Sequence, residues 1–158
     1  MGTQLRAVDA DNHYYEALDC CTRYLDPRFK RRGVEVLDQG THKVLLAGGR
    51  TFKFVPNPTF NPVIVPGCLD QLFRGQIPDG VEPSSLAQVE PIRAEYQNRD
   101  ARIRTMDEQG LDAILMFPTL ACGIEQALRG DIPATVATLS AFNRWLEEDW
   151  GSPTRTGS

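Results

Sequence analysis

The pattern of apolar and polar residues predicts one buried strand near the start of the chain and a second near its middle. Residues 5–10, LRAVDA, form a short apolar run that passes directly into a polar cluster, DNHYYE. Residues 111–117, LDAILMF, are apolar almost throughout and are followed by Pro118 and Thr119. Such a run is typical of a parallel-sheet strand that is covered on both faces.

Apolar residues at helical spacing predict three longer helices, over residues 15–25, 91–110 and 131–150. Gly110 stands where a C-terminal cap belongs, and Asp131 stands where an N-cap belongs. The last helix carries a marked apolar stripe that ends near Trp150. We also expect two short helical pieces, around residues 69–73 and 123–128.

The segment between the first strand and the second long helix predicts a small antiparallel insertion. Three short apolar or alternating runs, 34–37, 43–47 and 51–55, are separated by DQGT and by a Gly-Gly pair. Residues 56–91 are dense in Pro, Gly, Asn and Asp. A loop of this length inside a compact domain is usually functional or mobile.

The predicted order of elements is strand, insertion, helix, strand and helix. This order is typical of an α/β fold with parallel strands. We therefore expect residues 1–150 to form one α/β segment, with the meander and loop inserted at about 34–90. Residues 151–158, GSPTRTGS, lack an apolar anchor and are expected to form a disordered tail.

Composition and charge predict which classes of partner the protein lacks and where it is located. The net charge is −4 and no basic stripe is present, so we expect no nucleic acid partner. No apolar run approaches the roughly 20 residues of a membrane span, and the N-terminus lacks the apolar core of a signal peptide. We expect a cytoplasmic protein that does not contact a membrane. Its four cysteines form no CxxC pair and are expected to be ordinary buried thiols.

The polar cluster after the first strand contains candidate metal ligands. Side chains two residues apart on an extended chain point to the same side, so Asp11 and His13 can converge on one point. A carboxylate and a neutral imidazole suit zinc or manganese, but a catalytic metal needs at least three protein ligands. The alternative from spacing alone is a polar strand end at which Asp11 caps the following helix.

Three stretches together resemble a known family: VDADNHYYE, YQNRDARIRTMDEQGLDAILMFPT and AFNRWLEEDW. They are similar to the amidohydrolase-related branch of the metal-dependent amidohydrolase superfamily, which includes decarboxylases related to aminocarboxymuconate semialdehyde decarboxylase. The resemblance implies a (β/α)8 TIM barrel in which Asp11 and His13 bind a divalent metal, zinc or alternatively manganese. A closed barrel needs about 250 residues, so this chain would form a partial barrel of the first two strand/helix units.

The resemblance also implies roles for two further residues near the metal. Glu16 matches a glutamate expected close to the metal or hydrogen-bonded to a ligand, although a helix first-turn acid would have the same spacing. Thr119 would lie at the catalytic face after the second barrel strand, although a strand-end threonine is often structural. Family members take further histidines and an aspartate from later strands, whereas this sequence contains only His13 and His42. His42 is expected to be exposed in a turn. We therefore expect a truncated chain that binds zinc weakly or not at all.

The resemblance implies hydrolysis, hydration or nonoxidative decarboxylation of a small carboxylated or cyclic substrate, with the truncated chain expected to be inactive alone. The alternative is a noncatalytic remnant or interaction module of the same fold. In either case we expect a homo-oligomer or a partner chain to cover apolar side chains that this segment leaves exposed, namely Leu115, Phe117, Phe142 and Trp145.

Overall fold

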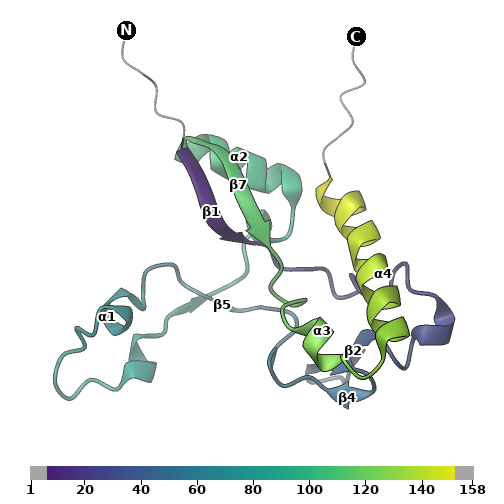
Figure 1. Cartoon of the computed structure of the whole chain (residues 1–158). Coiled ribbons are helices and arrows are strands. Elements are labelled where there is room, and N and C mark those ends of the chain that lie inside the picture. Colours follow the sequence, from purple (N-terminus) through teal and green to yellow (C-terminus); the bar gives the residue numbers. More distant parts are fainter. Residues whose placement is uncertain (1–6, 152–158) are drawn as a thin grey trace, which may run out of the picture. The chain divides into compact units, whose positions relative to one another are not determined.

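The structure is a computed structural model that describes residues 7–151 of the chain (Figure 1). The chain divides into two compact units, one formed by the residues up to Thr59 and from Ala94 onward, the other by Phe60–Arg93. Residues 5 and 6 of the first predicted strand, and all of the predicted disordered tail except Gly151, lie outside the described residues. The elements of the larger unit are β1 (Ala7–His13), η1 (Pro27–Phe29), β2 (Val34–Asp38), β3 (Lys43–Ala47), β4 (Arg50–Thr51), η3 (Ala94–Tyr96), α2 (Arg99–Gln109), β7 (Leu111–Phe117), α3 (Ile124–Ala127) and α4 (Ile132–Trp150).

The two predicted buried strands pair with each other in parallel, as β1 and β7. The register places Ala7 opposite Leu111 and His13 opposite Phe117, with irregularities between these two positions. Both strands therefore end at the same edge of the sheet. Helix α2 contacts β7 and immediately precedes it in the chain (Figure 1). The parallel pairing confirms the prediction for these two strands.

A three-stranded antiparallel meander, β2–β3–β4, confirms the predicted insertion. Its third strand, β4, contains only Arg50 and Thr51 and is shorter than predicted. The backbone N–H of Phe52 still donates to the carbonyl of Leu45, but the chain then turns over residues 53–56.

The predicted helix over residues 15–25 is wrong. The chain instead makes consecutive turns, in which the N–H groups of Cys20, Thr22 and Leu25 each bond the carbonyl three residues earlier. Cys20 and Cys21 are buried, and Arg23 pairs with Glu148 and Asp149 of α4. Tertiary burial therefore overrides the local helical pattern. Asp11 has no helix to cap, and its own N–H donates to Oδ1 of Asp9.

Helix α2 begins later than predicted and ends where predicted. The side chain of Asn98 accepts a hydrogen bond from the N–H of Ala101, which fixes the start of the helix at Arg99. Residues 94–96 form only the short η3 turn. At the other end Gly110 adopts a left-handed conformation with φ 69°, and β7 begins at the next residue.

The main core forms along α4. This helix starts after the N-cap Asp131, as predicted, and its buried residues are Ala134, Thr138, Ala141, Phe142 and Trp145. Trp145 is 1% exposed, and its ring lies 6.2 Å from that of Tyr14. The short helix α3 adds Ile124, which is fully buried. The expectation that Phe142 and Trp145 need a covering partner is therefore wrong.

Strand β7 is not covered on both faces by the residues described. Leu115 is 56% exposed and Phe117 is 45% exposed, and Val8 of β1 is 60% exposed. The apolar run correctly predicted the strand, but the part of the chain that the structure describes does not bury it.

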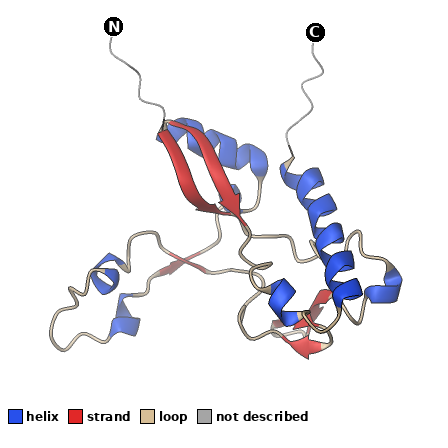
Figure 2. Ribbon diagram, in the orientation of Figure 1, coloured by secondary structure: helices blue, strands red, loops and turns tan. Residues whose placement is uncertain are grey.

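The smaller unit, residues 60–93, contains a two-stranded antiparallel pair, β5 (Val63–Ile64) with β6 (Val89–Glu90) (Figure 2). Helix α1 (Asp70–Phe73) and η2 (Pro83–Leu86) lie between these strands in the chain. The short helix predicted at 69–73 is confirmed. None of the helices within residues 7–151 is long and apolar enough to cross a membrane.

Candidate functional site

The carboxyl ends of β1 and β7 bring the predicted site residues together at one edge of the parallel sheet. Nε2 of His13 lies 3.4 Å from Oδ1 of Asp11. Both side chains are accessible, with exposed fractions of 52% for His13 and 86% for Asp11. The alternation of the strand thus places the carboxylate beside the imidazole, as the sequence predicts.

Two further polar residues, Asp9 and Asn12, form a hydrogen bond to each other near the end of β1. Nδ2 of Asn12 donates to Oδ2 of Asp9 at 2.7 Å. This bond, with the bond from the N–H of Asp11, lowers the pKa of the Asp9 carboxyl. Asp9 therefore stabilises the end of β1, while Asp11 keeps its carboxylate exposed.

Glu16 is the buried carboxylate of the site, with an exposed fraction of 1%. Its two oxygens accept hydrogen bonds from three consecutive backbone N–H groups after β7: those of Thr119 (3.1 Å), Leu120 (2.8 Å) and Ala121 (2.9 Å). Burial raises the pKa of the Glu16 carboxyl, and these backbone hydrogen bonds oppose that rise. Glu16 thereby joins the chain after β1 to the turn after β7. No helix begins here, so the first-turn interpretation of Glu16 is wrong.

Thr119 is the residue of this turn that reaches His13. Its Oγ1 donates to the carbonyl of Tyr14 at 2.8 Å and lies 3.5 Å from Nδ1 of His13. The opposite ring nitrogen, Nε2, faces Asp11. The threonine hydroxyl and the aspartate carboxylate therefore lie at the two nitrogens of one imidazole.

Arg102 is a site residue that sequence reasoning missed. It projects from α2, is 8% exposed, and donates from Nη2 to the carbonyl of His13 at 2.9 Å and from Nε to the carbonyl of Glu95 at 2.8 Å. Burial lowers the pKa of its guanidinium. Nothing in the sequence pattern distinguishes Arg102 from the other charged residues of α2. Its burial depends on where α2 packs.

The donor set fits part of a metal site. A carboxylate and an imidazole lie close enough to bind one divalent cation together, and both remain accessible. Within residues 7–151, no third histidine, cysteine or carboxylate completes a group that could hold a metal ion. Asp11 and His13 therefore fit as two ligands of a site that needs at least one more.

Comparison with known proteins finds similarity to a solved structure. No protein-family profile matches the chain, and no curated protein matches it significantly. Among solved structures, it is similar to an amidohydrolase from Mycobacterium avium subsp. paratuberculosis, with 57% sequence identity and a TM-score of 0.90. The chain is related to an amidohydrolase. The match covers 95% of this chain and 40% of the amidohydrolase chain, so this chain spans about two fifths of its relative's length. The mixed α/β architecture is consistent with a partial amidohydrolase fold.

Proposed function

We propose that this chain supplies the first two strand/helix units of a metal-dependent amidohydrolase barrel, and that Asp11 and His13 are two of its metal ligands. The observation that carries the proposal is the 3.4 Å approach of the imidazole to the carboxylate at the carboxyl edge of a parallel strand pair. Active sites of such barrels lie at this edge of the strands. The 57% identity to an amidohydrolase supports the same assignment.

Each residue of the site has a distinct role in this proposal. Asp11 and His13 bind the cation, through the carboxylate and through Nε2. Thr119 accepts a hydrogen bond from Nδ1–H of His13, which selects the tautomer whose Nε2 lone pair is free to bind. Glu16 and Arg102 hold the backbone on either side of the imidazole. A divalent metal, zinc or alternatively manganese, would lower the pKa of bound water or polarise a substrate carboxylate.

The proposed reaction is hydrolysis, hydration or nonoxidative decarboxylation of a small carboxylated or cyclic substrate. This range follows the amidohydrolase-related branch that includes decarboxylases related to aminocarboxymuconate semialdehyde decarboxylase. The remaining metal ligands would come from barrel strands beyond the two described here. The 158-residue chain alone is then expected to bind metal weakly and to lack activity.

One observation favours a second candidate function, a noncatalytic interaction module of the same fold. The β1–β7 sheet exposes Val8, Leu115 and Phe117, and exposed apolar groups of this kind are typical of surfaces that another chain or segment covers. In this alternative Asp11 and His13 are simply polar groups at a strand end.

A chimera distinguishes the two functions. This chain replaces the matched 40% of the mycobacterial amidohydrolase, and bound metal is measured by mass spectrometry beside the parent enzyme. The enzyme proposal predicts about one equivalent of metal in the chimera and a large loss in Asp11→Ala and His13→Ala, with His42→Ala as the matched control that retains the metal. A folded chimera that keeps its metal without His13, or that binds none while the parent binds one, would contradict it.

A further inference from the structure

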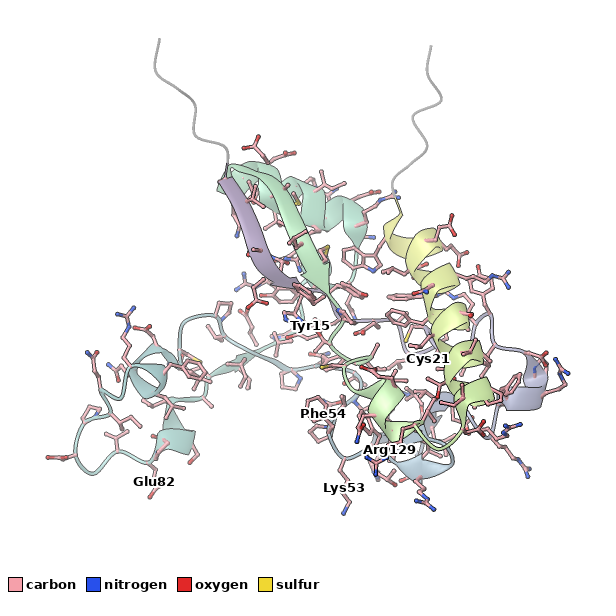
Figure 3. The ribbon with its side chains drawn as sticks, viewed as in Figure 1. Tyr15, Cys21, Lys53, Phe54, Glu82 and Arg129 are labelled. Carbon is pink, nitrogen blue, oxygen red and sulfur yellow. The ribbon has the colours of Figure 1, made fainter. Side chains whose placement is uncertain are left out.

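The larger unit contains a surface cavity that the proposed metal site does not use. It has a volume of about 600 Å³ and lies between the β3–β4 turn and the loop that joins α3 to α4. Figure 3 labels Arg129 at this loop. The charged residues that line the cavity are Arg32, Arg50, Arg129 and Asp131.

Two contacts hold the walls of this cavity together. Arg32 donates from Nε and Nη2 to the two carboxylate oxygens of Asp131, both at 2.7 Å. The same carboxylate caps α4 through the N–H of Ala134. Leu128 lies across the glycine turn, since a Cβ on Gly48 would be 3.5 Å from its Cδ2. The cavity is therefore bounded by segments that are fixed to one another before any ligand binds.

The charge that remains in the cavity is positive. Asp131 is neutralised by Arg32, and this hydrogen-bonded pair lowers the pKa of the Asp131 carboxyl. Arg50 and Arg129 form no ion pair with any described carboxylate. Two arginines that form no ion pair with a described carboxylate thus line one cavity, in a chain whose net charge is −4.

We propose that this cavity binds the phosphoryl group of a small phosphate monoester through Arg50 and Arg129. A planar guanidinium matches a phosphoryl group through paired N–H donors, and two such groups match its double negative charge. The volume is within the range of small-molecule pockets, about 300–1000 Å³, and leaves room for an organic group beyond the phosphate. Gln126 also lines the cavity, and its side-chain amide is a source of donors and acceptors for that group.

The test is isothermal titration calorimetry of the full chain with glycerol phosphate, inorganic phosphate and acetate. We expect glycerol phosphate to bind, and acetate to bind at least tenfold more weakly because it carries one charge. Arg50→Ala/Arg129→Ala should weaken glycerol phosphate binding by more than tenfold, since hydrogen bonds to charged groups are lost. The matched control is Arg74→Ala/Arg104→Ala, which removes the same charge outside the cavity and should change the affinity by less than about twofold.

The possible results of this titration lead to different conclusions about the cavity. Inorganic phosphate that binds as tightly as glycerol phosphate, with the same loss in the Arg50→Ala/Arg129→Ala variant, would identify free phosphate as the source of the phosphoryl group. No binding by the wild type, or an equal loss in the control variant, would overturn the site. Circular dichroism checks that each variant folds, and the single variants Arg50→Ala and Arg129→Ala give the same comparison if the double variant does not.

Discussion

The core along α4 and the β1–β7 sheet are both apolar in sequence, but only the first is buried by the described residues. Trp145 of α4 is 1% exposed, whereas Leu115 of β7 is 56% exposed. An amphipathic helix needs a partner on one side only, and this unit supplies it from Tyr14 and α3. A parallel strand needs cover on two faces and two edges, which a two-stranded sheet cannot supply. The sheet that carries the proposed metal ligands is thus the less buried of the two regions.

The largest expected effect comes from the same substitution made at a buried position and at an exposed one. Leu120→Ala removes a fully buried side chain and should lower the free energy of unfolding by about 2–5 kcal/mol. Leu115→Ala, five residues earlier, should lower it by less than about 0.5 kcal/mol because that side chain is already exposed. Urea unfolding of both variants measures the difference. Equal losses would show that the sheet is buried in solution.

A smaller loss of stability is expected when the hydrogen bonds that join Glu16, after β1, to the turn after β7 are broken. In Glu16→Gln the side chain keeps its shape, but its NH2 group must face backbone N–H donors of residues 119–121. The free energy of unfolding should fall by about 1–3 kcal/mol. Glu147→Gln, on an exposed position of α4, is the matched control and should change it by less than about 0.5 kcal/mol. A Glu16→Gln variant as stable as the wild type would remove the coupling role of Glu16.

The smallest effect is on association. If the exposed apolar side chains of the sheet promote contact between chains, Leu115→Lys should reduce concentration-dependent association in sedimentation velocity. Leu37→Lys, on β2 and 38% exposed, is the control and should leave association unchanged. A wild-type chain that remains monomeric at all concentrations would show that the exposed sheet does not drive association.

Local signals in the sequence predicted the elements that local chemistry determines. Gly110 ends α2, Asp131 begins α4, and Pro118 follows the last residue of β7. The strand alternation also predicted that Asp11 and His13 would lie side by side. The remaining features depend on contacts between distant parts of the chain. The carboxylate of Glu16 accepts hydrogen bonds from residues 119–121, which follow it in the chain by 103 to 105 positions. No periodic pattern near Glu16 indicates those partners.

The prediction of a helix over residues 15–25 was wrong for the same reason, because contacts between distant parts of the chain determine the structure there. Its apolar spacing was helical, but Cys20 and Cys21 are both buried and Arg23 bonds Glu148 and Asp149 of α4. These tertiary contacts favour turns over a regular helix. The burial of Arg102 likewise follows from the packing of α2 near the end of β1, where its guanidinium reaches the carbonyl of His13.

The most direct test of the account is a zinc titration of this chain followed by NMR of its two histidines, His13 and His42. His42 lies in the exposed β2–β3 turn and serves as an internal control. If Asp11 and His13 bind the metal together, the His13 ring resonances shift at lower zinc concentrations than those of His42, and Asp11→Asn removes this difference. Equal shifts of both rings, or an unchanged His13 response in Asp11→Asn, would contradict the assignment of Asp11 and His13 as paired metal ligands.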